Sequence, residues 1–174
     1  MPNDPVQIRP CQVSDYAGVA KLWVRINREL APEDMRERFE QYIATALMEE
    51  LRTAADVFAP SKRNGFWVVV AGEEIAGTFG IERRAPDVTE LRRMYLAAEH
   101  RGRGIAQRML QCAEQKAREY GFARMILSTA EVQKAAIVFY RRSGYRVVKT
   151  EAAEVMSTKT VGGGLVRYHF EKVL

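Results

Sequence analysis

The sequence predicts a mixed α/β (α+β) fold in which helices cover both faces of a central sheet. Segments rich in β-branched and aromatic residues are interleaved with segments whose apolar residues recur at helical spacing. Their order is strand, helix, helix, three strands, helix, strand, helix, two strands. No Pro-, Gly- or Ser-rich linker and no internal repeat divides the 174 residues. We therefore expect a single domain over residues 1–174 with about seven strands.

The first 60 residues are expected to form a short strand followed by two amphipathic helices. Residues 7–9 have strand character and end at a proline. The first helix shows apolar residues at positions i, i+3, i+4, i+7 and i+11. The second helix begins at Pro32, has acids in its first turn, and ends before Pro60. The apolar positions of the first helix are Val19, Leu22, Trp23, Ile26 and Leu30.

The rest of the chain predicts six strands and two helices. A turn at residues 71–74 separates the first two of these strands, which form a hairpin. Gly121 and Gly144 are suited to end the two helices, because glycine readily adopts the left-handed conformation at a helix C-terminus. A run of three glycines at residues 162–164 forms a turn before the last strand. The predicted strands cover residues 66–70, 75–82, 89–97, 125–129, 145–149 and 165–171, and the helices cover residues 103–120 and 134–142.

Composition and charge narrow the class of protein. Cys11 and Cys112 lie far apart and have no Cys or His neighbours at zinc-ligand spacing, so we expect two free thiols and no metal. No run of about 18 apolar residues occurs, and the first residues show no basic segment followed by an apolar one. A soluble cytoplasmic protein without a membrane partner is therefore expected. The net charge of +5 suits a polyanionic ligand, a nucleic acid or an acidic partner.

A phosphate-binding loop is predicted where the strand at residues 89–97 leads into the next helix. The first turn of a helix has backbone N–H groups without intrahelical partners, and these groups carry the positive end of the helix dipole. Glycines remove side chains that would keep a phosphate away, and flanking arginines add positive charge. The spacing matches neither the GxGxxG fingerprint nor a P-loop, so a different pyrophosphate-bearing ligand is expected. The loop consists of Arg101, Gly102, Arg103, Gly104, Ile105 and Ala106.

Several further motifs accompany this loop. The strand before it has the sequence Glu-Leu-Arg-Arg-Met-Tyr-Leu-Ala over residues 90–97. Downstream come Leu-Ser-Thr at 127–129, Ala-x-x-Phe-Tyr at 136–140 and Ser-Gly-Tyr at 143–145. Together these motifs resemble the GNAT superfamily of acyl-CoA-dependent N-acyltransferases, most strongly over residues 66–149. The resemblance implies a mostly antiparallel seven-stranded sheet, acetyl-CoA as co-substrate, and an enzyme that acetylates a primary amine.

The resemblance also implies which residues bind the cofactor. The loop at residues 101–106 would bind the pyrophosphate of CoA. The strand before it would pair through its backbone with the pantetheine arm at Met94, Tyr95 and Leu96, much as an added strand would. Gln133 stands where the family often has asparagine. It keeps the amide group on a side chain that is one methylene longer, and we expect it to contact the same arm.

Tyr140 and Glu90 are the residues that the resemblance assigns to catalysis. Tyr140 would protonate the departing thiolate of CoA. An alkyl amine is almost entirely protonated at neutral pH, so Glu90 or a water is expected to take its proton. A main-chain N–H near Leu96 would stabilise the oxyanion. Each side chain also has a structural interpretation, Tyr140 as a core tyrosine and Glu90 as a carboxylate paired with Arg92 or Arg83. Neither cysteine has a suitable sequence context for a covalent acyl-enzyme, so we expect direct transfer.

Two alternative functions stay open on the sequence alone. The domain could be a CoA-binding sensor or interaction module without catalysis. The arginines between residues 83 and 108 could also form a solvated basic face or a nucleic-acid site, which is disfavoured because they gather beside the phosphate loop rather than among aromatic residues. A homodimer is compatible with the resemblance. The acceptor is not identified, although three acids could either attract a cationic amine or simply begin a helix: Glu33, Asp34 and Glu37.

Overall fold

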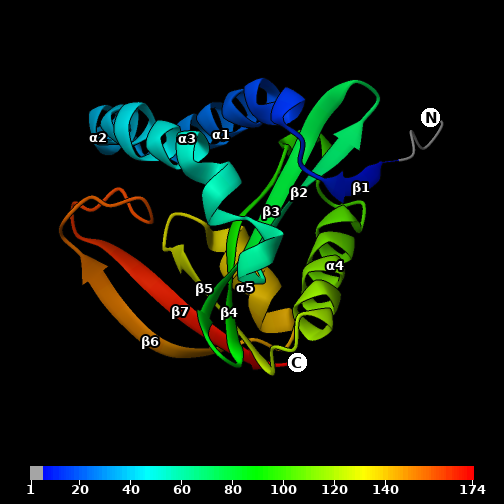
Figure 1. Cartoon of the computed structure of the whole chain (residues 1–174). Helices are drawn as coiled ribbons and strands as arrows, with labels where there is room; N and C mark the ends of the chain where they lie inside the picture. Colours follow the sequence, from blue (N-terminus) through cyan, green and yellow to red (C-terminus); the bar gives the residue numbers. More distant parts are fainter. Residues whose placement is uncertain (1–5) are drawn as a thin grey trace.

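The computed structural model describes residues 6–174 and contains a seven-stranded sheet with helices on both faces (Figure 1). The strands are β1 (Gln7–Pro10), β2 (Gly65–Ala71), β3 (Glu74–Ala85), β4 (Val88–Leu96), β5 (Arg124–Ala130), β6 (Arg146–Ala153) and β7 (Leu165–Val173). Their order in the sheet is β1-β2-β3-β4-β5-β7-β6. Neighbouring strands are antiparallel except for β4 and β5, which run parallel. The predicted fold class is confirmed. The first five residues, on which the expectation of no leader segment partly rested, lie outside the described part of the chain.

The helices are α1 (Tyr16–Leu30), α2 (Arg36–Tyr42), α3 (Met48–Val57), α4 (Ile105–Glu119) and α5 (Lys134–Arg142). The second helix expected from the sequence is divided into several segments. A 3-10 turn at Glu33–Met35 precedes α2, and a π-helical segment, Ile43–Leu47, joins α2 to α3. The buried residues of the π-helical segment are spaced as they would be in an α-helix. The apolar pattern therefore could not predict the wider turn of a π-helix.

The two larger hydrophobic cores lie on opposite faces of the sheet, and β2 contributes to both. Trp67 and Val69 belong to the core that α4 and α5 cover. Phe66 and Val68 belong to the core beneath α1, α2 and α3. Because successive side chains of a strand point to opposite faces, the continuous apolar run of β2 is what a strand covered on both sides requires.

The strands β4 and β5 separate soon after they pair. Their pairing joins residues 88–90 to residues 124–126, and no further pairing connects them within residues 6–174. A bulge at Arg93, whose φ is +52°, also disturbs the pairing of β4 with β3. It is held by Thr78, whose Oγ1 donates to the Arg93 carbonyl at 2.8 Å and accepts from Trp23 Nε1 at 3.1 Å. The second half of β4 therefore has a backbone edge without a neighbouring strand.

Candidate functional site

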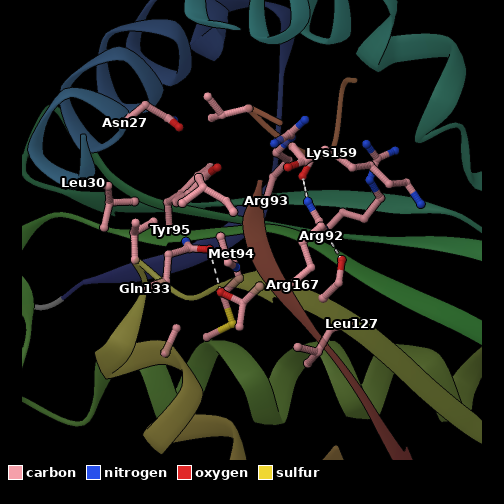
Figure 2. Close-up of a pocket in the computed structure, with 18 of the residues that line it drawn as sticks. Asn27, Leu30, Arg92, Arg93, Met94, Tyr95, Leu127, Gln133, Lys159 and Arg167 are labelled. Carbon is pink, nitrogen blue, oxygen red and sulfur yellow. Dashed lines mark hydrogen bonds between the residues drawn. The ribbon is translucent and has the colours of Figure 1, made fainter. Parts of the chain in front are cut away.

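A pocket lies between the separated ends of β4 and β5 (Figure 2). Its walls come from these two strands, from α1, α2 and α5, and from the loop between β6 and β7. The glycine-rich loop predicted to bind phosphate lies just beyond the end of β4, at the start of α4. Five of the predicted site residues line the pocket: Glu90, Met94, Tyr95, Gln133 and Tyr140.

The predicted phosphate loop has a backbone geometry that fits an anion. Gly102 and Gly104 have φ angles of +71° and +76°, a left-handed conformation that favours glycine. A Cβ atom added at either position would meet no atom within 4 Å, so the space in front of both is open. The hydrogen bonds found within residues 6–174 do not use the backbone N–H groups of Gly104, Ile105 and Ala106. These outward N–H groups at the N-terminus of α4 suit a phosphate.

The Arg101 side chain turns back toward β4 instead of extending from the loop. Its Nε donates to the Leu96 carbonyl at 2.9 Å, and its Nη2 lies 3.6 Å from the Glu29 carboxylate. Its backbone N–H donates to the Ala98 carbonyl at 3.1 Å. Arg101 therefore fastens the loop to the end of β4, and in this arrangement its guanidinium is already engaged.

The backbone of β4 directs Leu96 toward the open edge. The Ala97 N–H donates to the Ala76 carbonyl of β3 at 2.8 Å. Consecutive residues of an antiparallel strand direct their backbone groups to opposite edges, so the Leu96 N–H points to the side from which β5 has separated. Met94 and Tyr95 lie along the same stretch (Figure 2). Such an edge can bind an extended ligand through backbone hydrogen bonds.

Tyr140 and Gln133 come from the segment that follows β5. Tyr140 is 7% exposed and packs edge-on against Tyr145. Burial raises the pKa of the Tyr140 phenol, so the group is protonated at neutral pH and has a proton to donate. The Gln133 Oε1 accepts from Thr129 Oγ1 at 2.5 Å and from the Ala130 N–H at 3.2 Å, which ties β5 to the start of α5. Its amide NH₂ is the part that can donate to a ligand.

Glu90 is a buried carboxylate that pairs with two partly exposed cations. Its carboxylate lies 2.7 Å from Lys159 Nζ and also contacts the Arg84 guanidinium, whereas the sequence suggested Arg92 or Arg83 as partners. Burial raises the pKa of Glu90, but the attraction of Lys159, its hydrogen bond and the charge of Arg84 outweigh this effect and hold the pKa below its ordinary value. The Glu90 carboxylate is therefore ionised at neutral pH.

Replacing Glu90 with glutamine is expected to lower the free energy of unfolding by about 1 kcal/mol at neutral pH, because a buried carboxylate loses its pairs with two partly exposed cations, Arg84 and Lys159. The pKa of Glu90 is lower in the folded than in the unfolded chain, so its contribution is present above the unfolded pKa of about 4.3 and is lost as the pH falls below it. Denaturant unfolding of both proteins from pH 7 to pH 3 measures the difference.

The matched control for this experiment is Glu151→Gln, since Glu151 pairs with Lys149 and His169 on the exposed surface. Solvent screens such pairs, so little change in stability is expected. A difference between wild type and Glu90→Gln that stayed constant down to pH 3 would contradict the assignment of a lowered pKa to Glu90.

Four cationic side chains that were not predicted from the sequence also line this pocket. Arg92 and Arg93 on β4 are largely buried, and Lys159 and Arg167 come from the loop before β7 and from β7 itself (Figure 2). Of these four, only the burial of Arg167 could have been predicted from the local sequence. It lies two residues after Leu165, which is buried, and so shares its face of the strand. The acids considered as an attraction for a cationic acceptor are exposed and do not line the pocket: Glu33, Asp34 and Glu37.

Cys11 and Cys112 are free and partly buried, and neither lines the pocket. Within residues 6–174, no cluster of three or more His, Cys, Asp or Glu side chains is placed to hold a metal ion. None of the described helices is both long enough and apolar enough to span a lipid bilayer.

Comparisons with known proteins agree with this geometry. The model of the acetyltransferase (GNAT) family matches residues 22–145. N-acetyltransferase 8B of Rattus norvegicus is 26% identical over 113 residues, which cover 62% of this chain and 51% of that protein. The chain thus spans about half the length of the curated relatives it matches.

Two solved structures show the same fold over nearly the whole chain. An acetyltransferase of the GNAT family from Staphylococcus aureus Mu50 superposes with a TM-score of 0.75 at 16% identity, covering 98% of this chain and 99% of that one. PaiA N-acetyltransferase from Thermoplasma acidophilum, in complex with coenzyme A, superposes with a TM-score of 0.71 at 19% identity, covering 98% and 99%. With the family match over most of its length, the chain belongs to the acetyltransferase (GNAT) family.

Proposed function

We propose that this protein transfers the acetyl group of acetyl-CoA directly to the amine nitrogen of an acceptor. One observation carries the proposal: the backbone edge of β4 opens toward a single pocket that also contains Tyr140 and Glu90, beside a glycine loop with unpaired N–H groups. The strand edge can bind an extended cofactor arm, Tyr140 can donate a proton, and the glycine loop can bind an anion. Together with the Glu90 carboxylate, they meet where β4 and β5 separate.

The residues present fit acetyl-CoA. Within the loop at residues 101–106, the N–H groups of Gly104, Ile105 and Ala106 would hold the pyrophosphate, and the open spaces before Gly102 and Gly104 leave room for it. The backbone of Met94, Tyr95 and Leu96 would pair with the pantetheine arm, and the Gln133 amide would donate to it. When bound, acetyl-CoA supplies an acetyl group activated as a thioester. The coenzyme A in the Thermoplasma acidophilum structure supports this assignment.

Three groups of the chain would then act on the protons and charges of the transfer. The Leu96 N–H, directed to the open edge, would stabilise the negative charge that develops on the carbonyl oxygen. Tyr140 would donate a proton to the leaving sulfur. The amine proton would pass to Glu90 or to a water. Because the pKa of Glu90 is lowered, its carboxylate is a weak base. A water that Glu90 orients is therefore the better candidate to accept the amine proton.

The properties of the cysteines support direct transfer. A covalent acyl-enzyme would need a thiolate facing the substrate. Burial raises the pKa of the Cys11 thiol to about 12 and raises that of Cys112 as well, so both are protonated at neutral pH. Since neither lines the pocket, the acceptor amine itself is the nucleophile in this proposal.

The purified protein tests the proposal. It is incubated with acetyl-CoA and a panel of small amines, amino acids and peptides, release of free CoA is followed with a thiol reagent, and acetylated products are identified by mass spectrometry. We expect acceptor-dependent turnover and no burst of CoA release when the acceptor is left out. Tight binding of CoA by calorimetry without turnover on any acceptor would favour the alternative, a CoA-binding sensor, and a burst without acceptor would overturn direct transfer.

A further inference from the structure

The side chains that line the pocket for the acceptor carry a net positive charge. Four cationic side chains line it, whereas its only lining carboxylate among the described residues belongs to Glu90. Its other walls include apolar side chains such as Leu30, Phe39 and Val161. A cationic pocket disfavours a polyamine and favours an acceptor that carries a negative charge as well as its amine. The four cations are Arg92, Arg93, Lys159 and Arg167.

Most of these cations are already paired. Arg92 lies 2.7 Å from the Glu50 carboxylate and 2.6 Å from that of Glu82. Arg93 contacts the same Glu50 and donates to the Tyr42 hydroxyl at 2.9 Å. Glu90 holds Lys159 and reaches Arg84, as described above. The carboxylates of Glu50, Glu82 and Glu90 thus already pair with four cations. These are Arg84, Arg92, Arg93 and Lys159.

Arg167 is the lining cation without a carboxylate partner. No carboxylate of residues 6–174 forms an ion pair with it, although it is only 8% exposed. Its hydrogen bonds go to two neutral oxygens, the Lys159 carbonyl and the Ser128 hydroxyl. An arginine stays charged in a protein, and Glu90 and Glu151 act on this charge from a distance without forming an ion pair with it, so the cost of burying it is only partly offset. An anion in the pocket would offset that cost, and the planar guanidinium is suited to a carboxylate.

We propose that the acceptor is a small amine that also bears a carboxylate, as a free amino acid does, and that Arg167 binds this carboxylate. The inference rests on the acetyltransferase activity proposed above and names its class of acceptor. The carboxylate would sit beside the positive charge of Arg167, while the apolar walls would contact the rest of the molecule. The competing interpretation is that Arg167 serves only to hold the loop before β7 through the Lys159 carbonyl.

Matched pairs of acceptors that differ only in the carboxylate test the proposal. Leucine is compared with 3-methylbutylamine, and phenylalanine with 2-phenylethylamine, by kcat/KM for CoA release and by mass spectrometry of the product. We expect the amino acid of each pair to be preferred about tenfold or more, as a hydrogen-bonded charge contact allows. Equal rates, or faster acetylation of the decarboxylated amines, would overturn the proposal while leaving the acetyltransferase activity in place.

The variant Arg167→Gln separates carboxylate binding from a structural role. It is expected to reduce the preference for leucine over 3-methylbutylamine about tenfold by raising the KM for leucine, without a matching rise in the KM for acetyl-CoA. An equal loss for both acceptors would assign Arg167 to the loop alone and overturn the proposal. Arg167→Lys keeps the positive charge and should retain part of the preference for leucine. It replaces the glutamine variant in the experiment if that variant does not fold. Arg146→Gln, an exposed arginine on β6, is the control and should match wild type.

A second measurement keeps the inference testable if no acceptor is turned over. Calorimetry in the presence of CoA measures the binding of leucine and of 3-methylbutylamine to wild type and to Arg167→Gln. Binding of leucine by wild type alone would support the carboxylate site even in a protein without catalysis. Equal binding of both compounds, or binding of neither, would contradict it.

Discussion

Replacing Tyr140 with phenylalanine is expected to lower kcat about 100-fold, the size of effect typical for loss of a positioned proton donor. Tyr140 lies in the pocket formed by the separated strands, and burial raises its pKa, so its phenol holds the proton that a departing thiolate needs. Phenylalanine keeps the ring that packs against Tyr145 and Phe170. The KM for acetyl-CoA should therefore change little. Steady-state kinetics with a saturating acceptor measure both quantities.

Tyr145→Phe is the control for this experiment because Tyr145 lies in the same core but outside the pocket. Its hydroxyl is 3.1 Å from both Glu114 Oε1 and Met125 Sδ, and burial raises its pKa as well. Loss of this buried hydrogen bond should cost about 1 kcal/mol of stability without changing kcat. If both variants lowered kcat to the same extent, the effect would come from the core, and Tyr140 would lose its assignment as the acid.

Replacing Gly104 with alanine is expected to weaken CoA binding about 30-fold, because the loop would lose hydrogen bonds to a charged phosphate. The φ of Gly104 is +76°, and the space before it is open, so a Cβ would enter the region assigned to the pyrophosphate. An alanine also strains this left-handed backbone by about 1–2 kcal/mol. Calorimetry with CoA gives the dissociation constant, and denaturant unfolding gives the stability.

Gly72→Ala is the control that separates the effect of backbone strain on stability from the effect on CoA binding. Gly72 lies in the turn between β2 and β3, has a φ of +59°, and likewise has open space before it. Both variants should lose similar stability, but only Gly104→Ala should lose affinity for CoA. Wild-type affinity in Gly104→Ala, or an equal loss in Gly72→Ala, would remove the phosphate assignment from the loop.

The elements of the fold could be predicted because each depends on short-range patterns. The apolar stripe from Val19 to Leu30 marks α1, and the boundaries of α5 at Lys134 and Arg142 agree with the sequence prediction. The glycines at 102 and 104 indicated a loop with unusual φ, which the structure contains. Local sequence carries this information because helix periodicity, strand alternation and turn conformation involve residues only a few positions apart.

The charges of the pocket could not be predicted in the same way. Glu90 and Lys159 are 69 residues apart in the chain, and Arg93 meets Glu50 across 43 residues. Arg92 and Arg93 are consecutive on a strand, where one would be expected to face solvent. The bulge at Arg93 and the cover supplied by the loop before β7 bury both. No local pattern encodes this, because it depends on which distant segments pack together.

By itself, the sequence determined the mixed sheet, the glycine loop and the residues that resemble those of an acetyltransferase, since these follow from local pattern and motif. Only the tertiary structure decided where β4 and β5 part, that Glu90 is an ionised carboxylate held by Lys159 and Arg84, and that Arg167 is left without a carboxylate. The physical reason is that burial and ion pairing are set by residues brought together from across the chain, and these contacts fix the charge that the pocket presents to an acceptor.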